Sequence, residues 1–425
     1  MQPPTRPLLL ELDRQSLRTH AAELADWYAH HGEPPDQSPP YRVRVHARTQ
    51  AGRAARLQCR QWWARQLNRR QREQREYLRL CSQTIGADTH RYASSQAVAE
   101  DRDRRKRTLE WAARQAIQGP NGARHRLLPL LENATERRYA ELTAWTRGLD
   151  DYATAAGLVP ILVTLTLPPE WHPNPSQGRS SWNRASPRSA AAELSRRWDT
   201  LSRAIRRHLS EWCALRVREP HADGCPHDHL VAYVHPDEIE TLRALVAEHF
   251  PGRGGQVEQI TDAKGSTYAC KYIAKHTQGT DQDEDGEADP TEAVRAYRTV
   301  WGIRTFAFLG LPRGARTLYR LMRQIPGDLD HPADQGLQQA AKAGQVRRFL
   351  ELYKQAAPAV LTEEHTDRYG DPVRYARGII TSDGEPLELP RYEIVPAEDQ
   401  SPAPSYDEWA KGAPQPEDGT RDPGG

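Results

Sequence analysis

The sequence contains little that would place the protein outside a reducing cytosol. Its five cysteines, at positions 59, 81, 213, 225 and 270, form no Cys-x-x-Cys pair, and their number is odd. This usage is typical of free thiols and argues against a secreted fold held together by disulfides. No apolar run reaches eighteen residues and no secretory leader is visible. We therefore expect a cytoplasmic protein with no membrane partner.

The sequence also lacks the signature of a nucleotide-driven motor. It contains no Gly-x-x-x-x-Gly-Lys-Ser/Thr, the loop whose backbone amides cradle nucleotide phosphates. Internal repeats are not evident either. The 425 residues suffice for two or three domains with a buried core. We therefore expect a folded protein that has no ATPase activity of its own.

The charge is nearly balanced overall but unevenly distributed. The net charge is +2, yet twelve arginines and only two glutamates fall between residues 42 and 79. Acidic residues collect instead at 281–292 and in the Pro- and Gly-rich segment from about 396 onward, which we expect to be disordered. The arginine-rich stretch predicts a surface that binds nucleic-acid phosphates, although such a run is also typical of a solvated helical face.

Two adjacent tryptophans, Trp62 and Trp63, lie inside the arginine-rich stretch. Aromatic side chains in this setting either pack on a core or stack on bases, and packing is the more frequent outcome. The candidate DNA contacts in this stretch are Arg60, Trp63, Arg65, Arg69 and Arg70.

A pair of histidines predicts a metal site. His227 and His229 precede the apolar, partly β-branched residues 230–234, so they lie on a strand. Side chains two residues apart on a strand share a face, and both imidazoles therefore point the same way. A bare His-x-His is also common on ordinary surface strands, so the pair alone does not establish a site.

A third ligand is expected from the preceding strand. Residues 215–219 favour a strand, and Asp223-Gly224 is a turn signal, so the two strands form a hairpin. The hairpin brings Glu219 or His221 near the histidine pair, and the sequence leaves both possibilities open. Two histidines with a carboxylate suit a divalent ion with open positions, Mg²⁺ or Mn²⁺ in function, and would also accept Zn²⁺ or Co²⁺.

Downstream, two tyrosines predict a nucleophile. Tyr268 and Tyr272 are i and i+4 on a helix expected to begin at a cap, Ser266 or Thr267, and to run to about 276. A phenol with its ordinary pKa of about 10 is a poor nucleophile unless it is activated. Nearby cations favour the phenolate, and Lys271 and Lys275 form a second i, i+4 pair beside the tyrosines. The alternative is an amphipathic helix whose tyrosines only pack on a sheet.

Taken in this order, the motifs resemble the replication endonucleases of the phage gene A type. These belong to the HUH (His-hydrophobe-His) superfamily of rolling-circle initiators. The resemblance covers roughly residues 55–380. One residue departs from the pattern: Asp228 stands where the metal motif usually has a hydrophobe or an aromatic. It faces away from the histidines, so we expect it to affect packing rather than metal binding. The resemblance is carried by residues 62–67, 163–172, 219–230, 268–275, 301–306 and 310–312.

The resemblance implies a site-specific single-strand DNA endonuclease and strand transferase that initiates rolling-circle replication of a phage, prophage or plasmid. It also implies a 5′-phosphotyrosine intermediate. The expected partners are single-stranded and supercoiled origin DNA, a host helicase and a host polymerase. Two alternatives stay open. One is a two-tyrosine transposase or relaxase, and the other is a non-catalytic origin-binding protein with a vestigial metal site.

The expected fold class is α+β, with a central antiparallel sheet of the HUH endonuclease type flanked by helices. Strands are predicted at 161–167, 215–219 and 227–234, near 257 and within 300–308, and helices at 190–212 and 237–249. The expected domains are a helical, Arg-rich, DNA-binding region at 1–155, an endonuclease domain at 156–325, an accessory segment at 326–395 and a disordered tail at 396–425.

Overall fold

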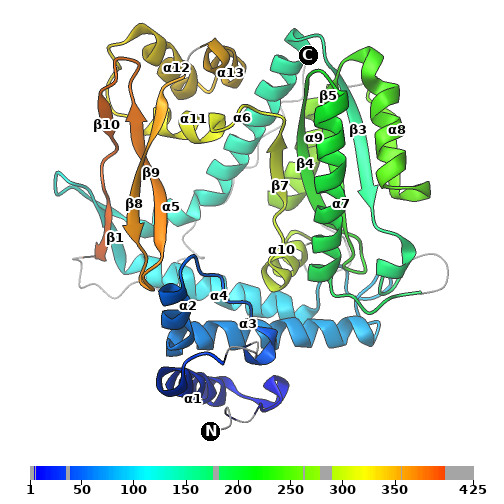
Figure 1. The fold of residues 1–425 in the computed structure, drawn as a ribbon, viewed down its shortest axis with the longest axis vertical. Helices are drawn as coiled ribbons and strands as arrows, with labels where there is room; N and C mark the ends of the chain where they lie inside the picture. The colour runs from blue at the N-terminus through cyan, green and yellow to red at the C-terminus, as the bar shows by residue number, and fades with distance from the viewer. Residues whose placement is uncertain are drawn as a thin grey trace, which may run out of the picture. The chain divides into compact units, whose positions relative to one another are not determined.

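Figure 1 shows the computed structural model, which describes residue 4 and residues 6–34, 39–175, 181–261, 264–277, 290–355 and 357–397. The side chains of residues 275–277 lie outside this description. The chain divides into two compact units. The first contains Met1–Val98 and Glu141–Leu389, and the second contains Ala99–Ala140 and Pro390–Gly425. No helix of the described residues is long and apolar enough to cross a bilayer.

A five-stranded sheet forms the centre of the first unit. Its strands lie in the order β6, β3, β5, β4, β7, and every neighbouring pair is antiparallel. The β4–β5 hairpin therefore has a further strand on each side, so its backbone is held by both neighbours. The strands are β3 (Val159–Thr166), β4 (Trp212–Pro220), β5 (Pro226–Val234), β6 (Gly255–Gln259) and β7 (Phe306–Leu309).

The hairpin turns at the Asp223-Gly224 pair, as the sequence predicts. Gly224 has φ +83°, a left-handed conformation that a residue without Cβ adopts freely. The Asp223 carboxylate accepts the backbone N–H of Cys225 at 3.0 Å, as short polar side chains do in turns. In the resulting register Glu219 is paired with His227. Directly opposed residues of an antiparallel pair share a face, so these two side chains lie close together.

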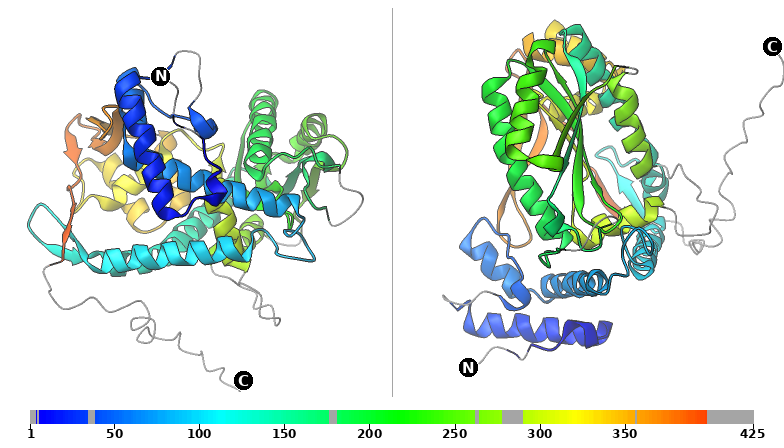
Figure 2. Two further views of the ribbon diagram at one scale, coloured as in Figure 1. Left: turned by 90° about the horizontal axis from the view of Figure 1, so that it is seen from below. Right: turned by 90° about the vertical axis from the view of Figure 1, so that its right-hand side faces the viewer.

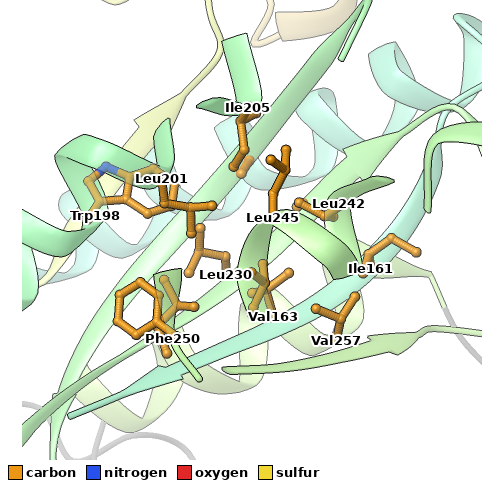
Figure 3. Packing of buried hydrophobic residues seen from close by; sticks show 14 of the residues in the cluster. Ile161, Val163, Trp198, Leu201, Ile205, Leu230, Leu242, Leu245, Phe250 and Val257 are labelled. Carbon is orange, nitrogen blue, oxygen red and sulfur yellow. The ribbon is translucent and has the colours of Figure 1, made fainter. Parts of the chain in front are cut away.

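One face of the sheet is apolar and is covered by α7 (Pro187–His208) and α8 (Ile239–His249). Helix α7 starts with Pro187 behind the N-cap Ser186, whose hydroxyl accepts the backbone N–H of Ser189. The buried residues of α7 recur at helical spacing, so one stripe of the helix faces the sheet. Figure 3 shows part of this core, which includes Val163, Trp198, Leu201, Ile205, Leu230, Leu242 and Leu245.

The opposite face of the sheet carries α9 (Gly265–Thr277), which packs on β4 and β5. Ala269 and Ile273 are the buried apolar residues of this helix. The right-hand view of Figure 2 shows helices on both faces of the sheet. Because strand side chains alternate between faces, residues 228, 230, 232 and 234 of β5 point towards α7, whereas 227, 229, 231 and 233 point the other way.

The N-terminal helices of the first unit have an apolar cluster of their own. Trp63 is fully buried in it and stacks on Tyr28, with ring centroids 5.7 Å apart. Asp371 links this region to the C-terminal part of the unit. Its carboxylate accepts the backbone N–H groups of Arg48 and Thr49 at 3.0 and 2.9 Å. The helices are α1 (Arg14–His31), α2 (Gln50–Leu57) and α3 (Arg60–Cys81).

The C-terminal part of the first unit combines helices with a three-stranded antiparallel sheet in the order β10, β9, β8. Its apolar cluster includes Trp145 at the C-terminal half of α6. The elements are α10 (Pro290–Trp301), α11 (Ala315–Gln324), α12 (Pro332–Lys342), α13 (Val346–Gln355), β8 (Ala359–Thr366), β9 (Pro372–Ile380) and β10 (Pro386–Glu388).

The second unit contains a small antiparallel sheet in the order β11, β1, β2. Helices α4 and α6 each belong in part to this unit and in part to the first. The elements are α4 (Ser95–Ala113), β1 (Gln115–Gln118), β2 (Arg124–Arg126), α5 (Leu127–Glu132), α6 (Ala134–Ala155) and β11 (Glu393–Pro396). Short 3₁₀ turns in the first unit are Leu9–Glu11, Pro40–Arg42, Pro169–Trp171, Pro236–Glu238 and Gly252–Gly254.

The α+β class predicted from the sequence is confirmed, but several element boundaries are wrong. The helix expected at 190–212 ends at His208, because Trp212 already begins β4. The tyrosine helix begins at Gly265, so neither Ser266 nor Thr267 is its cap. Most of the strand expected within 300–308 is instead the end of α10 and a loop. Residues 278–289 and the tail from 398 lie outside the described part of the chain.

Candidate metal centre and tyrosine site

Three side chains converge on the α9 face of the central hairpin. The Nε2 atoms of His227 and His229 are 2.8 Å apart. With Glu219, the three residues offer one ligand atom each, and these atoms all lie within 4.8 Å of one another. Within the described ranges, no other three His, Cys, Asp or Glu side chains converge in this way. The hairpin register explains the cluster, because it places Glu219 directly opposite His227.

The donor chemistry of the cluster fits a divalent cation. Two imidazoles and a carboxylate supply nitrogen and oxygen ligands and leave coordination positions open. The Thr164 hydroxyl on β3 lies 3.1 Å from His229 Nδ1, a contact that orients the ring and leaves Nε2 to face His227. Glu219 and His227 are buried. Glu219, His227 and His229 are therefore the residues that could hold a metal ion.

His221, the other third ligand considered from the sequence, lies behind His227. The two ring centroids are 4.0 Å apart, and Nε2 of His221 is buried without a hydrogen-bond partner among the described residues. Burial, followed by the charge of His172, lowers the pKa of His221 to about 4. The ring is therefore neutral at neutral pH. His221 thus contacts His227, but the ligand atoms that converge with those of the histidine pair are those of Glu219.

Helix α9 places one of the two tyrosines against this cluster. The ring of Tyr272 stacks on His229, with centroids 4.6 Å apart and planes inclined by 22°. Tyr268 lies one turn earlier, and Lys271 Nζ is 5.3 Å from the centre of its ring, within cation–π range. The side chain of Lys275 lies outside the described part of the chain. The structure thus brings Tyr272, Tyr268 and Lys271 to the histidine side of the sheet.

The surroundings of Tyr272 hold its proton in place. Burial raises the pKa of this phenol above its ordinary value, and the charge of Glu219 raises it further. The lysines were expected to favour the phenolate, whereas burial and the charge of Glu219 act on Tyr272 in the opposite direction. A cation at the cluster would offset the charge of Glu219 and favour ionisation.

A buried carboxylate that the sequence reasoning missed anchors the start of α9. Asp150 on α6 accepts the Ser266 hydroxyl at 2.8 Å. The adjacent Gly265 approaches β5 so closely that a Cβ there would lie 2.6 Å from the Tyr233 hydroxyl. Asp150 and burial together raise the pKa of Tyr233. No local pattern marks Asp150, because its partners are more than eighty residues away in sequence.

Asp228, the departure from the family motif, points away from the histidines as expected. Its side chain is completely buried, and its two oxygens accept Nε and Nη2 of Arg218 at 2.6 and 2.8 Å. Arg218 Nη1 also donates to the Ser195 hydroxyl on α7 at 2.9 Å. Arg218 and Asp228 are direct strand partners. The charged residue is therefore accommodated by a matched arginine on the neighbouring strand.

A second histidine–carboxylate contact, also missed from the sequence, lies beside the cluster. His172 Nδ1 is 3.1 Å from Asp223 Oδ2. The His172 ring packs edge-on against His221, with centroids 5.0 Å apart. The sequence did contain a signal for the Asp223 half of this contact. Asp223 belongs to the turn just before the metal motif, so its carboxylate was bound to lie close to the site.

The arginine-rich stretch forms α3, and Trp63 is not available to bases. Its indole is fully buried and donates from Nε1 to the Leu57 carbonyl at 2.7 Å. The predicted DNA contact at Trp63 is therefore replaced by a packing role. Arg60 remains largely exposed and pairs with the equally accessible Asp26, a weak type of pair that can exchange for a phosphate.

The other three candidate arginines have partners within the protein. Arg65 donates to the Tyr369 hydroxyl at 2.6 Å. Arg69 and Arg70 both donate to Glu73, at 3.0 and 2.7 Å. Their guanidinium groups are partly or largely exposed, so they contribute positive potential at the surface even though they are paired.

The fold and the site define an α+β protein in which a central hairpin carries two histidines and a glutamate, and a helix sets a tyrosine against them. The chain belongs to the bacteriophage replication gene A protein (GPA) family, whose model matches residues 11–280. This match includes the hairpin and the tyrosine helix. The resemblance noted in the sequence is thereby confirmed at the level of the family.

Relatives with curated names agree with this assignment. The chain is 30% identical over 293 residues to the "Replication gene A protein" of Escherichia phage 186, which covers 62% of this chain and 42% of that relative. It is 29% identical over 305 residues to the protein of the same name from Escherichia phage P2, covering 64% and 40%. A "Probable replication endonuclease from prophage-like region" of Escherichia coli O6:H1 is 25% identical over 332 residues, covering 69% and 41%. The chain thus matches less than half the length of these three relatives. No solved structure matches it.

Proposed function

We propose that the chain is a site-specific single-strand DNA endonuclease and strand transferase that initiates rolling-circle replication of a phage or prophage. One observation carries the proposal: the phenol ring of Tyr272 lies directly against His229, beside Glu219 and His227. A potential nucleophile next to a potential cation site is the arrangement that phosphodiester transesterification needs. The names of the relatives, which include replication endonucleases, support the same reading.

In the proposed reaction the tyrosine oxygen attacks the scissile phosphorus. A bond forms between that oxygen and phosphorus, the bond from phosphorus to the 3′ oxygen breaks, and the 3′ oxygen takes up a proton as the phenol gives one up. Mg²⁺ or Mn²⁺ bound by Glu219, His227 and His229 would polarise the phosphate oxygens. The residues of the chain position the strand, hold the tyrosine in line and keep the linked 5′ end. One phosphodiester replaces another, so neither cutting nor rejoining requires ATP.

The second tyrosine would allow a second cleavage. Tyr268 lies on the same helix face one turn away, about 6 Å along the axis. After one round of synthesis it can cut the regenerated origin while Tyr272 still holds the first end. The new 3′ hydroxyl then attacks the first phosphotyrosine and releases a circle. Priming and unwinding in this scheme fall to a host polymerase and a host helicase.

The proposal is tested by mixing the purified protein and Mn²⁺ with end-labelled single-stranded DNA from its own phage or prophage. A covalent protein–DNA band on a denaturing gel supports an endonuclease, transposase or relaxase. Binding without any covalent band supports the alternative of a non-catalytic origin-binding protein. Release of single-stranded circles from a supercoiled origin plasmid, with helicase and polymerase supplied, separates the replication initiator from a transposase or relaxase.

A further inference from the structure

A cavity of about 740 Å³ opens beside the metal cluster, and none of the described residues of the tyrosine helix lines it. Its size falls within the range of about 300–1,000 Å³ that is usual for small-molecule sites. The cavity is contiguous with the site, because His221 and Thr166, the latter paired with His227 across the sheet, belong to its wall. We call it the His172 pocket, and its polar wall includes Arg91, His172, Asn174, Arg197, His221 and Arg253.

A row of ring contacts leads from the tyrosine to the pocket, the first stacked and the others tilted or edge-on. Tyr272 packs on His229, His229 on His227, His227 on His221 and His221 on His172. Successive centroids in this row are 4.6, 4.6, 4.0 and 5.0 Å apart. The tyrosine therefore lies at one end of the row, the histidine pair lies in the middle, and the pocket lies at the other end.

Phosphoryl transfer requires the attacking and leaving oxygens to be roughly in line through phosphorus. If the tyrosine oxygen attacks from the α9 end of the row, the leaving oxygen must lie towards the opposite end. That oxygen is the 3′ oxygen of the nucleotide on the 5′ side of the scissile phosphate. The geometry therefore directs this nucleotide to the His172 pocket.

The chemistry of the pocket wall suits a nucleotide. Leu167, Pro168, Phe250 and Pro251 supply apolar surface for a base, and three arginines supply cations for its phosphates. The one carboxylate in the wall, Asp223, is in contact with His172. Arg197 is paired with Glu193 at 2.8 Å, whereas Arg91 and Arg253 form no ion pair with a carboxylate among the described residues.

We propose that the His172 pocket is a nucleotide subsite that holds the 5′-side nucleotide of the cut, before cleavage as part of the strand and afterwards as the 3′-hydroxyl end. This inference rests on the proposed function. The pocket would keep the 3′ end at the site while the 5′ end is held on tyrosine, so that the two ends stay together for rejoining. Arg253 and Arg197 are the positioning residues for its phosphates.

The first test measures binding without chemistry. The Tyr268→Phe/Tyr272→Phe protein is titrated in chelator with a fluorescein-labelled, mixed-sequence single strand, and anisotropy gives the dissociation constant. Adding Arg253→Gln should weaken binding about tenfold, the loss expected of a charged hydrogen bond to phosphate. Arg197→Gln should also weaken it, whereas the matched change Arg196→Gln should not. Arg196 shares Glu193 with Arg197 but does not line the pocket.

The second test locates the bound nucleotide. In a strand that the wild-type protein cuts, a neutral methylphosphonate replaces the phosphate next to the scissile one, on either its 5′ or its 3′ side. A methylphosphonate on the 5′ side should raise the half-saturating DNA concentration for adduct formation in wild-type protein, and Arg253→Gln should add little to it, because the charge that Arg253 binds is already gone. On the 3′ side the two effects should add, because the groups do not touch.

The outcomes separate this inference from the proposed function. Normal cutting with binding unchanged in Arg253→Gln and Arg197→Gln would overturn the subsite and leave the endonuclease in place. Additive effects on the 5′ side would overturn it as well. If no strand is ever cut but Arg253→Gln and Arg197→Gln weaken binding and Arg196→Gln does not, the pocket binds nucleotides and the endonuclease proposal fails.

Discussion

Tyr272 lies face to face with His229, with ring centroids 4.6 Å apart and planes inclined by 22°. The contact joins the tyrosine helix to the central strand of the sheet and sets the proposed nucleophile beside the residues that could bind a metal ion. It also distinguishes the two tyrosines, because Tyr268 lies one helical turn earlier. Burial raises the pKa of Tyr272, so within the protein alone this phenol holds its proton more tightly than a free tyrosine does.

The metal assignment predicts a loss of cutting that spares DNA binding. Replacing His227 or His229 with Ala should abolish adduct formation, because each change removes one of three ligands. The affinity for single strands should change by no more than about twofold, because the arginines expected to bind DNA lie on α3, whereas His227 and His229 lie on β5. His208→Ala, an exposed histidine at the end of α7, is the control. Chelator should mimic the mutations and Mn²⁺ or Mg²⁺ should reverse its effect, whereas full cutting in chelator would refute the assignment.

The site was predictable from the sequence to the extent that its residues are local. The spacing of His227 and His229, the turn at Asp223-Gly224 and the i, i+4 tyrosines each follow from strand or helix periodicity. Periodicity could not choose between Glu219 and His221, because that choice depends on the hairpin register. The register is set by pairing across two strands, which no single stretch of sequence displays.

The residues missed from the sequence depend on long-range contacts. Asp150 meets the tyrosine helix, and His172 meets Asp223, only because distant segments pack together. Strand β8 was missed for a different reason. Its second half, from Thr362 to Thr366, is polar and mostly exposed, so the strand lacks the apolar alternation that marks a half-buried strand. Trp63 was predicted to contact DNA because its neighbours are arginines. Its position on α3 instead points the side chain into the apolar core between α1, α2 and α3.

The buried pair of Arg218 and Asp228 predicts a strong asymmetry between mutants. Asp228→Ala should lower the free energy of unfolding by about 3–5 kcal/mol, because it leaves the arginine buried without its partner. The double change Arg218→Met/Asp228→Leu should lower it less, since Arg218 is then not left buried without its partner and only the weaker contact of Arg216 with Asp228, at 3.8 Å, is lost. Glu240→Ala, which breaks the exposed pair with Arg243, should cost no more than about 1 kcal/mol.

Urea titration of the three proteins provides the comparison. A double mutant that is less stable than Asp228→Ala would contradict the account of Asp228. It would mean that Asp228 stabilises the fold by more than neutralising the charge of Arg218.

The anchor at the start of α9 predicts a defect in rate rather than in binding. Asp150→Ala should slow single-turnover adduct formation about tenfold, because the helix that carries the nucleophile loses its hydrogen bond through Ser266. Asp150→Asn should recover most of the rate, since an amide oxygen can still accept that bond. Asp151→Ala changes the exposed neighbour on the same helix and should have no effect.

Ser266→Ala should not add to the defect of Asp150→Ala, because the two residues act through one contact. Fully additive rate losses would show that Asp150 acts elsewhere. If Asp150→Ala weakened strand binding as much as it slowed adduct formation, Asp150 would have a purely structural role.

The two tyrosines should be unequal in the first cut. Tyr→Phe removes the nucleophilic oxygen and preserves packing, so stability serves as an internal control. Tyr272→Phe should reduce adduct formation more than Tyr268→Phe, because Tyr272 is the one stacked on His229. Both single mutants should fail to release circles from a supercoiled origin, since release needs a second cut while the first end is held. Normal circle release by either mutant would show that the tyrosines do not alternate.

The most direct test of the central claim is the covalent adduct itself. Wild-type protein, Tyr268→Phe/Tyr272→Phe and the control Tyr375→Phe, which changes an exposed tyrosine on β9, are each incubated with labelled single-stranded DNA and Mn²⁺. The products are separated on a denaturing gel. The account predicts a covalent band for wild-type and Tyr375→Phe proteins and none for the double mutant. A covalent band from the double mutant would place the nucleophile elsewhere and contradict the function proposed for this site.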